Sequence, residues 1–118
     1  MSPPGRPQGE YRSAQHEGTP VSRALTPTEI VTRLADRPGW TLSGDGAEVA
    51  IEKTFRFLDY YETIAFVNAL AFIAHAMDHH PDLSVHYRHC VVRWRTHAVQ
   101  GISDLDFTAA ARADALLP

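Results

Sequence analysis

The 118-residue sequence has few of the features that mark several common classes of protein. Its one cysteine, Cys90, excludes an intramolecular disulfide and a cysteine metal cluster and fits a reducing cytoplasm. Its 11 Lys and Arg residues are outnumbered by 14 Asp and Glu residues, whereas a dedicated DNA- or RNA-binding module is usually basic. The most apolar stretch, residues 60–74, is shorter than the ~20 residues of a membrane helix. We therefore expect a cytoplasmic protein with no direct nucleic-acid partner and no membrane segment.

The first 20 residues differ in composition from the rest of the chain. They are rich in Pro, Gly, Ser and Gln and lack the apolar core of a secretory signal. Such a segment buries too little apolar surface to offset its chain entropy, which favours disorder. We expect a disordered tail over residues 1–23 and one folded domain over residues 24–118.

Three segments carry the start signals of helices. Thr26-Pro27-Thr28-Glu29 combines a capping box with a proline that suits the first helical position. Asp59-x-x-Glu62 has a similar pattern, and Ser103 opens the third segment. The first helix should end at Pro38-Gly39 and the second at Pro81.

Alternating apolar and polar side chains predict strands between these helices. The alternation covers Val49–Phe57, Leu83–Tyr87 and Val92–Thr96, with a hairpin turn near Arg88-His89, and Trp40–Leu42 can form a short strand. The resulting order is αββαββα. Short hairpins favour a four-stranded antiparallel sheet with three helices packed on one face, which is an α+β fold.

The helix that begins after Asp59 has two apolar faces. One consists of Phe66, Leu70, Ile73 and Met77, and the other of Ile64, Val67, Ala71 and Ala74. Because one sheet can cover only one of these faces, we expect self-association.

The best candidates for catalytic residues are the histidines of His79-His80-Pro81 and Thr96-His97, together with Asp106. Taken singly, the histidine pair could interact with the dipole at a helix C-terminus, and Asp106 could cap the last helix. Together they place three imidazoles and a carboxylate within about thirty residues. Because imidazole titrates near neutral pH, this cluster favours general acid/base chemistry.

Two other chemistries fit the sequence less well. His75 and His79 are four residues apart and could chelate zinc, with His97 as a third ligand. The glutamate of a His-Glu-x-x-His motif is missing between them, so we expect no metal. Cys90 lies in a predicted strand and should be buried, which makes it a poor nucleophile.

These motifs resemble those of the pterin-4a-carbinolamine dehydratase family, whose fold is shared with a dimerisation cofactor of a homeodomain transcription factor. The resemblance rests on the joint spacing of His79-His80-Pro81, Thr96-His97 and Asp106, and extends over about Leu25–Leu116. It implies an αββαββα fold and dehydration of 4a-hydroxytetrahydropterin to quinonoid dihydropterin, without a metal or organic cofactor. It also implies a homodimer or homotetramer and a functional link to an aromatic amino acid hydroxylase.

By position, the resemblance implies that His79, His80, His97 and Asp106 are the catalytic residues. Water loss from C4a requires proton delivery to the hydroxyl and proton removal from N5. We expect His79 and His97 to form the acid/base pair, in either order, and His80 to bind or orient the pterin. Asp106 would position His97 or the substrate. The other predicted substrate-binding residues are Asp78, Pro81 and Thr96.

Two positions depart from the pattern expected of the family. His75 stands where a glutamate is expected, and Gln100 stands where a glycine is expected after His97. Some relatives act as coactivators or look like assembly chaperones, so a non-catalytic binding protein on the same fold is the alternative. The complete set of motif residues favours the enzyme.

Overall fold

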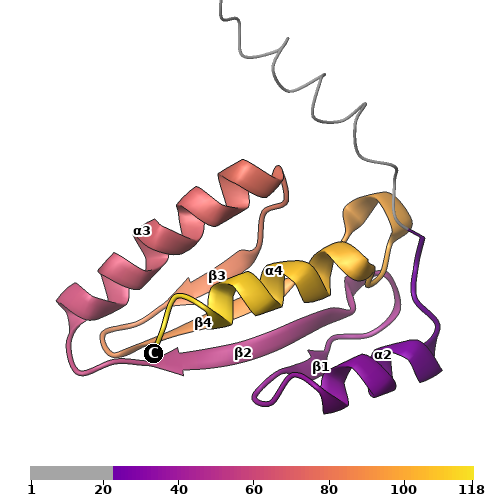
Figure 1. Ribbon diagram of the computed structural model, residues 1–118, viewed down its shortest axis with the longest axis horizontal. Coiled ribbons are helices and arrows are strands. Elements are labelled where there is room, and N and C mark those ends of the chain that lie inside the picture. The colour runs from indigo at the N-terminus through magenta and orange to yellow at the C-terminus, as the bar shows by residue number, and fades with distance from the viewer. Residues whose placement is uncertain (1–22) are drawn as a thin grey trace, which may run out of the picture.

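The computed structural model describes residues 23–118 (Figure 1). The predicted tail therefore lies outside the described residues, apart from Arg23. The order of elements is α2 (Pro27–Ala35), β1 (Thr41–Ser43), the 3-10 turn η1 (Gly46–Glu48), β2 (Ala50–Arg56), α3 (Tyr60–Met77), β3 (Asp82–Val85), β4 (His89–Trp94), the 3-10 turn η2 (His97–Val99) and α4 (Asp104–Asp114).

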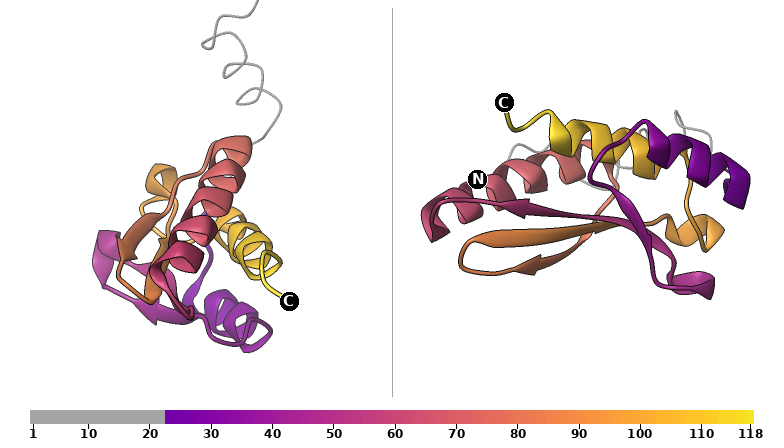
Figure 2. Two further views of the ribbon diagram at one scale, coloured as in Figure 1. Left: turned by 90° about the vertical axis from the view of Figure 1, so that its left-hand side faces the viewer. Right: turned by 90° about the horizontal axis from the view of Figure 1, so that it is seen from below.

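The four strands form one antiparallel sheet in the order β1-β2-β4-β3. The three helices lie on one face of this sheet (Figure 2). The predicted α+β fold with the order αββαββα is confirmed. Central β4 is buried between its neighbours, and its C-terminal end leads directly into the segment that carries Thr96 and His97.

Side-chain caps start the helices where the sequence predicts. Thr26 and Glu29 form a complete capping box on α2, and the Asp59 side chain accepts a hydrogen bond from the backbone N–H of Glu62 on α3. Ser103 caps α4, and Asp106 completes its capping box. This last box places Asp106 at the buried start of α4.

Helix α3 ends earlier than predicted. Its last residue is Met77, and Asp78 follows as a C-cap in the left-handed region with φ of 51°. The backbone N–H of Asp78 closes the helix by donating to the carbonyls of Ala74 and His75. The turn ahead of Pro81 therefore belongs to a connection to β3, which turns His79 inward and leaves His80 exposed.

The β3–β4 hairpin turns about one residue earlier than predicted. The backbone N–H of His86 donates to the carbonyl of His89 over 2.8 Å, so Tyr87 and Arg88 form the turn. Tyr87 is exposed and stacks on Tyr60, with ring centroids 6.2 Å apart. The contact with α3 thus replaces the strand pairing that the alternation predicted for Tyr87.

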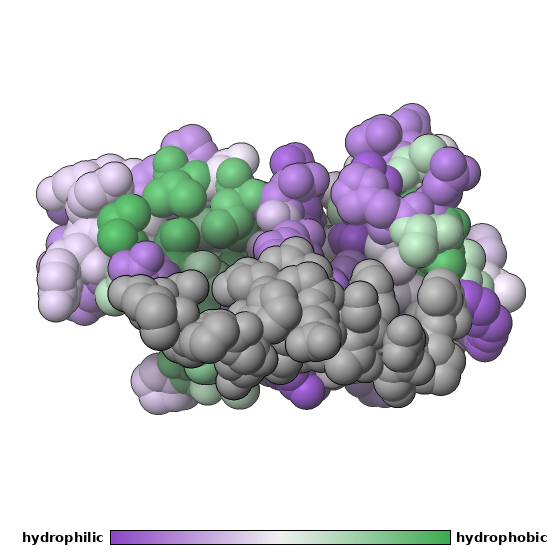
Figure 3. All heavy atoms as spheres, turned by 90° about the horizontal axis from the view of Figure 1, so that it is seen from above, coloured by the Kyte–Doolittle hydropathy of each residue, from purple (hydrophilic) through white to green (hydrophobic). Residues whose placement is uncertain are grey.

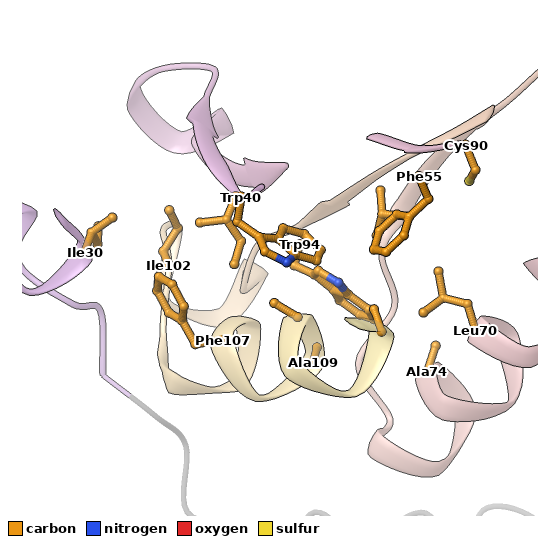
Figure 4. Packing of buried hydrophobic residues seen from close by; sticks show 14 of the residues in the cluster. Ile30, Trp40, Phe55, Leu70, Ala74, Cys90, Trp94, Ile102, Phe107 and Ala109 are labelled. Atoms are coloured by element: carbon orange, nitrogen blue, oxygen red, sulfur yellow. The ribbon is translucent and has the colours of Figure 1, made fainter. Parts of the chain in front are cut away.

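The core lies between the sheet and the helices (Figure 4). Trp94 of β4 is fully buried and lies between the sheet and Ala109 of α4 (Figure 4). Small side chains on α4 allow this helix to approach the indole closely, because large ones would overfill the layer. The fully buried ones are Ala109, Ala110 and Ala113.

The outer surface of α3 is strongly apolar. Phe72 is 75% exposed, and apolar side chains gather over the half of the molecule in which α3 lies (Figure 3). The predicted second face is divided, because Ala74 belongs to the core whereas Ala71 is exposed. Among residues 23–118, no helix combines the length and apolarity that crossing a bilayer requires.

Candidate active site

The centre of the site is a buried pair of side chains, His79 and Asp106. The Nε2 atom of His79 lies 2.7 Å from Oδ1 of Asp106. His79 follows α3 and Asp106 lies in the first turn of α4, so the contact joins the end of one helix to the start of another through residues 27 positions apart. The side chain of Asp106 is fully buried, and that of His79 is 10% exposed. A buried carboxylate normally requires such a partner.

The second oxygen of Asp106 is held by two donors. The Thr96 hydroxyl donates to Oδ2 over 2.8 Å, and the backbone N–H of Ser103 donates to the same atom over 2.9 Å. The hydroxyls of Thr96 and Ser103 are 2.7 Å apart, and Ser103 Oγ also accepts from the backbone N–H of Leu105. Both carboxylate oxygens are therefore occupied, and Asp106 has a fixed orientation.

Two contacts fix the orientation of the His79 ring: one face stacks on an aromatic ring, and one nitrogen bonds to Asp106. The ring stacks on Trp94, with centroids 5.5 Å apart and an interplanar angle of 15°. Because an ionised carboxylate only accepts, Nε2 of His79 donates to Asp106 and its neutral ring has the lone pair on Nδ1. Trp94 acts here through its ring, because its buried indole N–H has no hydrogen-bond partner among the described residues.

The residues next to His79 line the same connection. His80 is exposed, whereas Asp78 and Pro81 are half-buried. The left-handed backbone of Asp78 reverses the chain direction between α3 and the histidine pair. The backbone N–H of His79 donates to the carbonyl of Ala74 over 3.1 Å, which fixes the start of the connection.

His97 lies on the other segment of the site and does not bond to Asp106. It begins η2, one residue after Thr96, and is exposed. Its Nδ1 lies 3.3 Å from Nη2 of Arg95. Gln100 closes η2 with φ of 51°, a left-handed conformation that glycine adopts without strain. That conformation explains in physical terms why a glycine is expected at this position.

The structure thus joins His79, Thr96 and Asp106 in one hydrogen-bonded network, and His80 and His97 are each the chain neighbour of a network residue. Asp106 was expected to position His97 or the substrate; its carboxylate bonds to His79, Thr96 and the backbone of Ser103 instead of His97. Sequence reasoning missed Ser103 as a site residue, although its place as the cap of α4 was a usable signal. It also missed Arg95 and Trp94, whose roles depend on contacts between distant segments.

Two further histidines, on the β3–β4 hairpin, lie apart from this network. His86 and His89 stack on each other at the hairpin, with centroids 4.2 Å apart. Burial, and then the nearby charges of His86 and Arg56, lower the pKa of His89. Over residues 23–118, no group of three or more His, Cys, Asp or Glu side chains is arranged to hold a metal ion.

The fold and site together define an α+β protein with a buried histidine–carboxylate pair suited to moving protons. Residues 23–116 match the family model described as pterin 4 alpha carbinolamine dehydratase. The chain belongs to this family.

Relatives with this description cover most of the chain. A protein of Paracidovorax citrulli is 75% identical over 95 residues, which are 80% of this chain and 82% of that protein. A protein of Stenotrophomonas maltophilia is 48% identical over 110 residues, which are 93% of this chain and 91% of that protein. Both bear the name "Putative pterin-4-alpha-carbinolamine dehydratase".

Two solved structures are also similar. A transcriptional coactivator/pterin dehydratase from Brucella melitensis has a TM-score of 0.76 and 28% identity, covering 81% of this chain and all (100%) of that chain. A pterin dehydratase-like protein described as a RuBisCO assembly factor in the alpha-carboxysome has a TM-score of 0.57 and 25% identity. That match covers 66% of this chain and 88% of the other.

Proposed function

We propose that the protein dehydrates 4a-hydroxytetrahydropterin, a pterin carbinolamine, to quinonoid dihydropterin. The observation that carries the proposal is the buried network of His79, Asp106 and Thr96, with the exposed His80 and His97 next to it. The family membership of the chain supports the same substrate class.

The reaction requires only proton transfer and bond cleavage. The C4a–O bond breaks, N5 loses its proton, a C4a=N5 double bond forms, and one water leaves. The oxidation state of the whole molecule does not change. Two imidazoles, one that donates and one that accepts a proton, are sufficient for these steps.

We assign the chemistry to His79 and His97 and the orientation of the pterin to His80. Asp106 holds His79, so we make it the positioning residue of that imidazole. Thr96 is only 5% exposed and is bonded to Asp106 and Ser103. We therefore give Thr96 a positioning role in place of the direct pterin contact expected from the sequence. Asp78 and Pro81 would form the wall beside His80.

The decisive experiment follows chemically generated 4a-hydroxytetrahydropterin by ultraviolet absorbance. The wild type should accelerate dehydration, and His79→Ala and His97→Ala should each lower turnover by about 100-fold or more. His86→Ala is the matched control, because His86 is an exposed histidine at the hairpin turn. Full activity of both site variants would contradict the assignment, and no acceleration by the wild type would contradict the proposed function.

A non-catalytic role is the second candidate. It is favoured by the similarity to the protein described as a RuBisCO assembly factor. In that case the wild type would bind a protein partner without accelerating the pterin reaction. The histidine variants would then leave partner binding unchanged.

We further propose a cytoplasmic homodimer or homotetramer that supports pterin recycling by an aromatic amino acid hydroxylase. The exposed Phe72 on the apolar surface of α3 supports self-association. Light scattering of Phe72→Asp should show a smaller species than the wild type, and an unchanged mass would exclude this face as the interface. We also propose that residues 24–118 fold and function without the preceding residues, which a truncated chain would test in the same activity assay.

A further inference from the structure

We propose that Arg95 is a positioning residue that fixes the tautomer of His97, so that His97 presents an Nε2–H group to the departing hydroxyl. The inference rests on the proposed function for its chemical meaning. The tautomer itself follows from the contacts of Arg95 and can be measured without substrate.

Two partners in η1 hold Arg95 in place, one a backbone carbonyl and the other a side-chain carboxylate. Its Nη1 donates to the carbonyl oxygen of Ala47 over 2.6 Å, and its Nη2 lies 3.8 Å from Oε1 of Glu48. The side chain of Arg95 is only 16% exposed, so its guanidinium has little freedom to turn away. The same Nη2 atom is 3.3 Å from Nδ1 of His97.

A guanidinium has five N–H donors and no acceptor. The nitrogen of His97 that faces Arg95 must therefore offer a lone pair, because an N–H there would point at another N–H. With Nδ1 as the acceptor, the proton of the neutral His97 ring resides on Nε2. Arg95 thus fixes which nitrogen of His97 is a donor.

The partner of His79 selects the opposite arrangement. Asp106 accepts from Nε2 of His79, which leaves Nδ1 of the neutral ring as a proton acceptor. The two histidines therefore differ in function: His79 offers a lone pair and His97 offers an N–H. This difference assigns His79 as the base for the N5 proton and His97 as the donor to the C4a hydroxyl.

Each partner also has the charge that stabilises its ring after proton transfer. His79 becomes positive when it takes the N5 proton, next to the Asp106 carboxylate. His97 becomes negative as its Nε2 proton joins the departing hydroxide to form water, next to the Arg95 guanidinium. The proton on His79 then returns through solvent to His97, so both rings regain their starting states.

The test uses nitrogen-15 NMR of the imidazole rings in the full chain, with His97→Gln identifying the His97 signals. In the wild type, Nδ1 of His97 should have the shift of an unprotonated nitrogen and Nε2 that of a protonated one. In Arg95→Gln the two signals should move toward the averaged values of mixed tautomers. Arg93→Gln is the matched control, because Arg93 lies in β4 only two residues before Arg95 and pairs with Glu52. A protonated Nδ1 in the wild type, or unchanged signals in Arg95→Gln, would overturn the proposal.

Activity gives a second, separable result. Arg95→Gln should lower kcat by about 10-fold or more with KM little changed, because a ring in the wrong tautomer cannot donate to the hydroxyl. Arg95→Lys keeps a donor and should recover part of kcat and of the NMR signature; it also serves if the glutamine variant does not fold. If the wild type has no dehydratase activity, the proposed function fails while the NMR result still decides the role of Arg95.

Discussion

Asp106 bonds the imidazole of His79 through Oδ1, at 2.7 Å, while its Oδ2 accepts the backbone N–H that begins α4. One carboxylate thus completes the capping box of a helix and fixes the tautomer of a candidate base. The site is therefore assembled by the same contacts that start α4. Any substitution of Asp106 should therefore affect both the contact with His79 and the cap of α4.

The first prediction concerns the substitution Asp106→Asn, which preserves shape and removes the charge. An asparagine has one acceptor oxygen, so its amide NH₂ must face either the N–H of His79 or the N–H of Ser103. We expect the free energy of unfolding to fall by about 1–3 kcal/mol. We also expect turnover to fall by about 100-fold, because His79 loses its orienting partner.

Urea unfolding and the pterin assay measure these two effects. Asp104→Asn is the control, since Asp104 lies in the same helical turn, is exposed and pairs with Arg33. It should change the free energy of unfolding by less than about 1 kcal/mol and leave turnover intact. Equal effects of the two substitutions would refute the special role of Asp106.

The second prediction concerns Asp114, at the end of α4. Its carboxylate accepts from Lys53 at 2.8 Å, from the indole N–H of Trp40 at 3.0 Å and from Arg37 at 3.2 Å. These donors come from β2 and from the segment after α2, so Asp114 joins three parts of the chain. Asp114→Ala should lower the free energy of unfolding by about 1–3 kcal/mol, because a buried indole donor and two cations lose their shared acceptor.

Thermal and urea unfolding test this expectation, with Asp45→Ala as the comparison. Asp45 precedes η1, and its side chain makes no capping hydrogen bond there. Its removal should change stability by about 0.5 kcal/mol or less. A loss for Asp114→Ala no larger than that of Asp45→Ala would show that the shared acceptor contributes nothing.

Much of this fold could be predicted from local patterns. The capping boxes of α2 and α4 and the alternation in β2 and β4 are local signals, and each element formed close to its predicted place. The end of α3 could not be predicted in this way, because Asp78 adopts a left-handed conformation that the sequence does not require of an aspartate. Pro81 shows that the helix must end before it, but it does not show that the last helical residue is Met77.

The residues of the candidate site could be proposed from the sequence, but the hydrogen bonds between them could not. The joint spacing of the histidines and Asp106 indicated the segments that the structure brings together at His79, Thr96 and Asp106. Which imidazole meets the carboxylate depends on how α3 and α4 pack, and this is not written in any local pattern. The contact of Arg95 with the carbonyl of Ala47 joins residues 48 apart and is equally non-local.

The third prediction concerns the pH dependence of stability through Glu29. Hydrogen bonds from Arg23 and from the backbone of Thr26 lower the pKa of Glu29 from 4.5 to about 2. A lowered carboxyl pKa in the folded state stabilises the protein above the unfolded value of 4.5. This stabilisation is lost as the pH falls from there toward 2.

Glu29→Gln should therefore have a lower melting temperature than the wild type at pH 7, and the two melting temperatures should converge near pH 2 to 3. The difference at pH 7 should also shrink in high salt, because Arg23 and Glu29 are exposed. A difference in melting temperature that stays constant from pH 7 to pH 2 would contradict the ionic origin of the effect.

The fourth prediction uses the single thiol as a reporter of unfolding. Cys90 is fully buried in β4, and burial raises the pKa of its thiol. A thiol reagent should react with native protein only after the sheet opens, and its rate should rise toward that of a free thiol in urea. Val31→Cys in a Cys90→Ala chain is the exposed comparison, because Val31 is 66% exposed on α2, and it should react at once in the folded state. Rapid labelling of Cys90 without denaturant would contradict its burial.

The fifth prediction tests the left-handed backbone at Gln100, which closes η2 three residues after His97. A residue with a Cβ atom costs about 1–2 kcal/mol in this conformation, whereas glycine has no such cost. Gln100→Gly also gives the unfolded chain more freedom, which offsets about 0.5–1 kcal/mol of the gain. We expect Gln100→Gly to match or exceed the wild type in stability and Gln100→Val to fall below it, because a β-branched side chain fits this region poorly. Melting temperatures of the three proteins would check the order, and a glycine variant less stable than the valine variant would show that the conformation of η2 is not set by residue 100.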